Sequence, residues 1–158
     1  MGRELKKFAG AALGLGTLVL LSSCSWITDF VIANTSQSEL SVSYLVSGKS
    51  CPDDNFIIVP ARKDITDLEK DGAKWQKLTS KEYTCNENNF IVATTLPPRT
   101  ALLVARVATY TGSASYGNDN FQVLRLELKG SEGEISLKGL QVLKAFKFES
   151  KTLFVLHY

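Results

Sequence analysis

The sequence has few of the residues on which common active sites depend. Its 158 residues include one His, one Met and three Cys. A single imidazole leaves little material for a histidine-based active site or for a metal centre with several His ligands. The chain also has no Gly-x-Ser-x-Gly nucleophile elbow and no glycine-rich phosphate loop. The sequence therefore carries no signature of an α/β-hydrolase or of a nucleotide-binding enzyme.

The chain also lacks an excess of charge. It has 18 basic and 16 acidic side chains, and residues 1–23 hold three of the basic and one of the acidic ones. The rest of the chain therefore has 15 of each, so we expect no nucleic-acid partner. A hydrophobic share of 44% excludes a disordered chain, and 11 Gly with 4 Pro exclude a collagen-like one. The length fits one domain with a real core.

The N-terminus has the layout of a secretory signal. Residues 1–7 carry three basic side chains and one acidic one, and residues 8–21 carry no charge. This apolar run has 14 residues, whereas a membrane-spanning helix needs roughly 20. Small residues then precede Cys24, as expected next to a cleavage site. We therefore predict a cleaved signal peptide over residues 1–23.

The motif Leu21-Ser22-Ser23-Cys24 resembles the lipobox of bacterial lipoproteins. The resemblance implies cleavage before Cys24 and a diacylglycerol on its thiol, and this covalent lipid is the only cofactor that we expect. Two or three acyl chains hold a protein firmly on a membrane. Ser25, rather than Asp, follows the cysteine, which in this family implies delivery to the outer membrane, on its periplasmic face. We predict a short lipid-anchored tether at 24–28 and a domain at 29–158, with Trp26 and Ile27 either at the lipid headgroups or capping the core.

The two remaining cysteines, Cys51 and Cys85, fit an exported protein. Disulfides persist outside the cytosol, and two Cys without nearby His do not complete a zinc site. We therefore predict a Cys51–Cys85 disulfide, which would close a loop of 34 residues. On the chain-entropy estimate such a loop is worth about 4 kcal/mol.

The sequence pattern of the mature chain predicts mainly β-strands. Apolar side chains alternate with serines along residues 40–46, the pattern of a half-buried strand. Similar short apolar runs recur between Gly, Asn, Asp and Pro turns, so we predict an all-β fold: an antiparallel β-sandwich or small β-barrel of about seven to nine strands. The expected strands cover residues 29–33, 40–46, 56–59, 90–96, 101–110, 121–128, 135–137 and 152–158.

Two local predictions follow from the pattern. The polar turn 34–38 favours a hairpin between strands 29–33 and 40–46. Alternation within 121–128 places Leu124, Leu126 and Leu128 on one face.

The segments 61–83 and 140–148 fit no single period. The first is polar and is compatible with a short helix or with a strand around Trp75. The second has apolar residues at both strand and helix spacing, and its strand neighbours favour a strand.

The candidate metal and catalytic residues are few. Asp67, Glu69 and Asp71 match the first half of a calcium loop, but its twelfth position is Leu78 rather than a bidentate acid. A solvated charged turn is the better interpretation, so we predict no metal site. His157 shares a face of the last strand with Leu153 and Val155, and we interpret it as structural rather than catalytic.

The loop 111–120 is the longest stretch of small and polar residues, and loops on rigid β scaffolds often carry binding. Tyr116, Asn118 and Asp119 are the binding candidates within it. Together with Tyr83-Thr84-Cys85 and the lipid anchor, this loop distantly resembles the periplasmic lysozyme-inhibitor lipoproteins. The chain departs from that family because it lacks the Ser-Gly-x-x-Tyr signature and a following Trp-x-Lys-Gly.

These patterns predict a lipid-anchored envelope lipoprotein that acts without catalysis, as an accessory module that docks a protein partner. An envelope hydrolase that uses carboxylates not distinguishable in the sequence is the alternative from another class. A lysozyme-inhibitor-like lipoprotein is the minor alternative.

Overall fold

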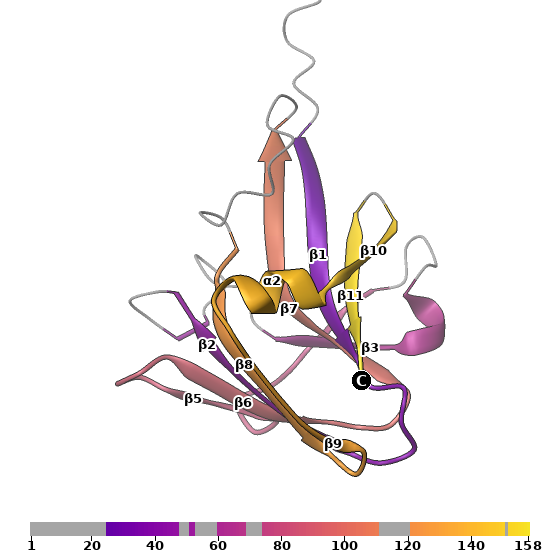
Figure 1. Cartoon of the computed structure of the whole chain (residues 1–158), viewed down its shortest axis with the longest axis vertical. Helices are drawn as coiled ribbons and strands as arrows, with labels where there is room; N and C mark the ends of the chain where they lie inside the picture. Colours follow the sequence, from indigo (N-terminus) through magenta and orange to yellow (C-terminus); the bar gives the residue numbers. More distant parts are fainter. Residues whose placement is uncertain (1–24, 48–50, 53–59, 69–73, 111–120, 151) are drawn as a thin grey trace, which may run out of the picture.

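The protein folds as a sandwich of two β-sheets (Figure 1). The computed structural model describes residues 25–47, 51–52, 60–68, 74–110, 121–150 and 152–158. Neither sheet closes on itself, so the predicted all-β sandwich is confirmed and a closed barrel is not formed. Eleven strands lie in the described residues, more than the sequence predicts, because several edge strands are only two to four residues long.

The first sheet has six strands, and β1 lies near its centre. Strand β1 pairs antiparallel with β7 and parallel with β11, which joins the first and last strands of the chain. The strand order is β10 (Lys147–Ser150), β11 (Leu153–His157), β1 (Ser25–Ala33), β7 (Thr100–Tyr110), β3 (Ala61–Asp64) and β4 (Gln76–Lys77).

The second sheet has five strands and is wholly antiparallel. The strand order is β5 (Tyr83–Asn86), β6 (Ile91–Leu96), β2 (Leu40–Val46), β8 (Val123–Gly130) and β9 (Gly133–Lys138). Every second residue of β2 is buried, as the alternation predicts, while the serines of β2 face outward. The main core lies between the two sheets.

A second, smaller core covers the outer face of the first sheet. The 3-10 helix η2 (Ile65–Asp67) follows β3, and Ile65, Leu68 and Trp75 pack over that face. The ambiguous segment 61–83 therefore contains both a short helix and a strand next to Trp75. The predicted strand at 56–59 lies outside the described residues.

The predicted hairpin between the first two strands is wrong. Strands β1 and β2 belong to different sheets, so residues 34–39 cross from one sheet to the other. Asn34 is fully buried at this crossing, and its amide donates to the carbonyls of Leu96 and Pro97 at 3.0 and 3.1 Å. Its side-chain oxygen accepts from Ser36 Oγ at 2.7 Å. The polar residues that suggested a tight turn instead satisfy a buried crossover.

The predicted inward face of 121–128 is wrong at one residue. Leu126 and Leu128 are fully buried, but Leu124 is 45% exposed. The register between β2 and β8 shifts at this point, because Leu45 pairs with Arg125 and Val46 with Val123. The extra residue in β8 turns Leu124 outward and Val123 inward, as a β-bulge does.

The strand predicted over 140–148 is a short helix followed by a strand. Helix α2 (Leu140–Ala145) buries Val142 and, just after its end, Phe146, which are spaced one helical turn apart. Gly139 opens the helix with a positive φ of 55° and donates its N–H to the carbonyl of Leu124. Strand β10 then begins at Lys147. Figure 1 shows α2 crossing from β9 in one sheet to β10 in the other.

Strand β1 begins earlier than the sequence predicts. Residues 25–28, assigned to the tether, belong to β1 and pair with residues 107–110 of β7. The described part of the fold therefore begins at Ser25, and Cys24 lies outside the described residues. Among the described helices, none is long and apolar enough to cross a bilayer.

Candidate functional site

Two regions stand out as candidates: the end of the molecule where β1 begins, and a groove beside β5 and β6. At the first, β1 and β7 extend as a two-stranded ribbon, which we define as residues 25–28 with 107–110. Figure 1 shows β1 and β7 side by side at this end, above the rest of the fold. Ile27 on this ribbon is 54% exposed, so it does not cap the core.

The ribbon ends at an ion pair. Arg106 Nε and Nη2 donate to the two carboxylate oxygens of Asp29 at 2.6 and 2.9 Å. These residues are direct cross-strand partners in β7 and β1. The bidentate hydrogen bond, more than the charge of Asp29, raises the pKa of Arg106 above its ordinary value.

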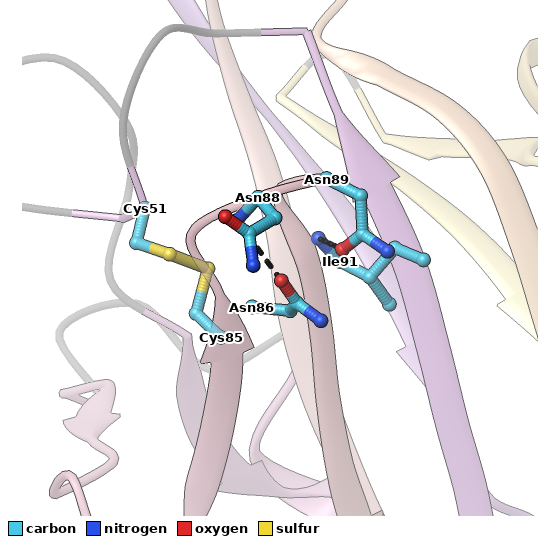
Figure 2. Close-up of a disulfide and its surroundings, with 6 residues drawn as sticks. All are labelled: Cys51, Cys85, Asn86, Asn88, Asn89 and Ile91. Carbon is cyan, nitrogen blue, oxygen red and sulfur yellow. Dashed lines mark hydrogen bonds between the residues drawn. A yellow bond between two sulfur atoms is a disulfide. The ribbon is translucent and has the colours of Figure 1, made fainter.

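The predicted Cys51–Cys85 disulfide is confirmed (Figure 2). Its S–S bond is 2.01 Å long and the two Cα atoms are 5.9 Å apart. Cys85 lies in β5, the edge strand of the second sheet, so the bridge ties the chain before residue 53 to that edge. Among the described strands, β5 has no neighbour on its outer side, so the bridge attaches this segment to an open strand edge.

The turn between β5 and β6 is held by asparagines next to this disulfide. Asn86 Oδ1 accepts from the Asn88 N–H at 2.9 Å, and Asn89 Oδ1 from the Ile91 N–H at 3.4 Å (Figure 2). Phe90 takes a positive φ of 52° between them. Side-chain oxygens that bond to backbone two residues onward fix such turns. The disulfide and this turn make the β5–β6 edge a rigid support.

A shallow groove of about 280 Å³ lies along β5, β6 and the start of β2. Five of its lining residues carry hydroxyl groups, and a lysine and a glutamate add one charge of each sign. Such a lining offers donors and acceptors for a polar partner. The groove is lined by Ser41, Lys81, Glu82, Tyr83, Thr84, Ala93, Thr94 and Thr95.

Glu82 connects this groove to the first sheet. One of its carboxylate oxygens accepts from the Thr79 N–H at 2.9 Å and from its hydroxyl at 3.0 Å, and the other accepts from Arg62 Nη2 at 3.0 Å. These bonds, the Thr79 N–H first, lower the pKa of Glu82. Thr94 Oγ1 also donates to the Glu82 carbonyl at 2.7 Å. Glu82 therefore lines the groove with a carboxylate whose position is fixed by three hydrogen bonds.

His157 lies far from any such cluster. Its Nε2 is 3.1 Å from Glu149 Oε1, and both side chains are exposed on neighbouring strands. Leu153 and Val155 share its face of β11, as the alternation predicts. Within the described ranges, no three His, Cys, Asp or Glu side chains are grouped as a metal site requires.

The remaining candidate residues fall mostly outside the described part. Asp67 lies in η2, after Asp64, whose side chain accepts from the Thr66 N–H as a helix cap. The other candidates are Glu69 and Asp71 of the half calcium loop and Tyr116, Asn118 and Asp119 of the loop 111–120, and all of them lie outside the described residues. Their binding roles stay predictions.

Sequence reasoning singled out Trp26 and Ile27 of the ribbon and Tyr83-Thr84 of the groove, but it predicted neither the pairing that forms the ribbon nor the groove itself. The groove combines Ser41 and Thr95 with residues 81–84, which adjoin only once the strand order is known. The run of serines in 40–46 was a signal for a polar outer face, although it gave no partner strand. Comparison of the chain with protein-family models, with curated proteins and with solved structures gives no match.

Proposed function

We propose that the protein is a lipid-anchored lipoprotein of the bacterial cell envelope that works as a non-catalytic binding module. The observation that carries this proposal is the order of the N-terminal features. A basic segment, an uncharged run of 14 residues and Leu21-Ser22-Ser23-Cys24 follow one another, and a β-strand starts at the next residue. A lipid on Cys24 would thus join the first strand of the sandwich without a spacer.

The placement of the groove supports a binding role. Strands β5 and β6 lie at the end of the molecule away from the start of β1 (Figure 1). With Cys24 in the outer membrane, the groove beside these strands would face the periplasm. Its hydroxyl groups suit a polar surface of a protein partner better than an apolar ligand. The rigid β5–β6 edge would present these groups without loss of conformational freedom.

The anchor is tested by the chemistry of the N-terminus. We expect mass spectrometry of the protein from membranes to find a chain that begins at Cys24 and carries diacylglycerol. The Cys24→Ala variant should accumulate as an unprocessed, unacylated precursor, whereas a Cys51→Ala variant should be acylated normally. A parent protein with an intact Met1, or with an unmodified start, would contradict the proposal.

The binding role is tested by affinity capture from detergent-solubilised envelope. We expect a stoichiometric protein partner with the parent, and its loss with Thr84→Arg, which fills the groove from the exposed face of β5. Glu134→Arg, an exposed position on the far edge strand β9, is the matched control and should retain the partner. If both variants recover the partner equally well, the groove is not the binding site.

A further inference from the structure

We propose that the outer part of the ribbon, residues 25–27 paired with 108–110, lies in the lipid headgroup layer, while its inner pair Thr28–Val107 is buried in the domain and the Asp29–Arg106 pair lies on the water side. This inference rests on the proposed anchor at Cys24 and adds a second, non-covalent membrane contact that fixes the orientation of the domain. The surface is formed by two paired strand ends, and the alternation of residues within one strand does not predict that pairing.

The composition of the ribbon changes sharply at one cross-strand pair. The ribbon contains four cross-strand pairs: Ser25–Tyr110, Trp26–Thr109, Ile27–Ala108 and Thr28–Val107. None of these eight residues is charged. The next pair is Asp29 with Arg106, bonded through both carboxylate oxygens. Trp and Tyr are the residues that concentrate at membrane interfaces, so the ribbon has the composition of an interfacial segment.

Thr28 and Val107 of the ribbon are buried against the domain, but no described strand pairs with either outer edge of the ribbon. Strand β11 pairs with β1 only from Asp29 onward, and β3 pairs with β7 only between Thr100 and Leu103. Its outer backbone groups therefore need a polar environment, which the hydrocarbon core does not offer and the hydrated headgroup layer does. The two residue steps from Ser25 to Ile27 span about 7 Å, which matches the roughly 5–8 Å thickness of one headgroup layer.

Ile27 supplies an apolar contact at this level. It is one of four large hydrophobic side chains that are exposed among the described residues, and its exposed fraction is 54%. Because β1 begins one residue after Cys24, Ile27 lies three residue steps, about 10 Å, from the cysteine that we propose is acylated. Contact with lipid would cover this side chain without any change in the fold.

The chain has two tryptophans, Trp26 in the ribbon and Trp75 beside β4, and these allow a direct test. The acylated full-length mature protein would be placed in phosphatidylcholine vesicles with bromine near the glycerol end of the acyl chains. In a Trp75→Phe variant, the fluorescence of Trp26 should fall about two-fold or more relative to unbrominated vesicles. In a Trp26→Phe variant, the fluorescence of Trp75 should be unchanged.

A flexible insert and two matched substitutions separate this inference from the anchor itself. With a Gly-Ser insert between Cys24 and Ser25, a ribbon that binds lipid keeps Trp26 quenched, whereas a ribbon held near lipid only by its tether does not. Ile27→Asp should abolish the quenching of Trp26 with the insert present, and Leu124→Asp, at a residue of similar exposure, should not. Both sites are exposed, so both variants should unfold at the parent's urea midpoint.

The outcomes distinguish two failures. A bare Cys24 in protein from cells would contradict the proposed anchor; the mature chain coupled at Cys24 to a maleimide lipid would still test the ribbon. Trp26 that stays unquenched, or as accessible to acrylamide as Trp75, would overturn the lipid contact. Trp26 shielded from acrylamide but unquenched by lipid, with a crosslink from the ribbon to another protein, would overturn it in favour of a protein partner on the open strand edges.

Discussion

At the scale of single residues, Tyr44 carries an unusual hydroxyl. Its ring is fully buried in the core, and its hydroxyl has no hydrogen-bond partner among the described residues. A buried polar group without a partner costs about 1–3 kcal/mol. Burial, and secondarily the nearby Tyr83, raises the pKa of Tyr44 above the ordinary value of 10.0. The core therefore tolerates this hydroxyl and is not stabilised by it.

We expect Tyr44→Phe to raise the free energy of unfolding at pH 7 by about 1 kcal/mol, measured by urea denaturation. The raised pKa of Tyr44 also predicts how the stability difference between variant and parent changes at high pH. A phenol with a raised pKa in the native state ionises first in the unfolded chain, so the parent loses stability as the pH rises above about 10. The advantage of the variant should then grow by about 1.4 kcal/mol between pH 9 and pH 11. A destabilised variant, or an advantage independent of pH, would contradict this account.

Unlike the hydroxyl of Tyr44, the buried side chain of Asn34 has hydrogen-bond partners for both its amide nitrogen and its oxygen. Its amide donates to three backbone carbonyls, of Ser38, Leu96 and Pro97, and its oxygen accepts from the N–H and the hydroxyl of Ser36. We expect Asn34→Ala to lower the free energy of unfolding by about 2–4 kcal/mol, because buried carbonyls lose their donor.

The matched control for this variant is Asn88→Ala, since the side chain of Asn88 is exposed in the β5–β6 turn. It should shift the urea midpoint little. Equal effects of the two substitutions would show that the buried network at Asn34 adds no stability.

The burial of a residue was predictable where apolar and polar residues alternate strictly. It was not predictable where it depends on which strands pair and in which register. The buried positions of β2 follow from its alternation, as does the side of β11 on which His157 lies. Leu124 does not, because the bulge that turns it outward depends on the register against β2. Asn34 also reads as a turn residue in the sequence, and only the crossover between the sheets explains its burial.

At the scale of elements, the disulfide joins a connecting segment to the edge strand β5. We expect the double variant Cys51→Ala/Cys85→Ala to lose about 4 kcal/mol of unfolding free energy, because the open chain gains the entropy of a 34-residue loop. Urea denaturation with and without reductant measures this loss.

The parent in reductant should match the double variant, and the double variant should not respond to reductant. A reduced parent as stable as the oxidised one would show that the bridge constrains little in the unfolded chain.

The existence of most strands was predictable, whereas their partners were not. Short apolar runs bounded by turn residues mark β2, β6, β7, β8 and β11 in the sequence. The pattern of 140–148 allows a strand or a helix, and the need to cross between sheets over the core decides for α2 followed by β10. The groove and the ribbon both depend on which strands are paired, so the sequence pattern pointed to single residues such as Trp26 and Thr84 but not to the surfaces that they form.

At the scale of the whole molecule, the last strand completes the first sheet and also contacts the second. Strand β11 fills the place beside β1, and the hydroxyl of Tyr158 donates to the Gly133 carbonyl at 2.7 Å. The ring of Tyr158 lies so close to Gly130 that a Cβ there would be 2.8 Å from it. The C-terminus therefore connects both layers of the sandwich.

We expect a chain that ends at Thr152 to lose its cooperative unfolding transition, since β1 would lose a neighbour and both cores would lose side chains of β11. Near-ultraviolet circular dichroism and urea denaturation measure this. His157→Ser, which changes an exposed side chain of the same strand, should leave the transition in place. A truncated chain that still unfolds cooperatively would show that β11 is dispensable.

The parallel pairing of β1 with β11 also has a consequence for biogenesis. Strand β1 also pairs with β7, but its other edge stays open until residues 153–157 are available. Pairing between segments so far apart in the sequence closes a long loop and forms slowly. On the export route that we propose, both strands must have left the secretion channel before this edge can close.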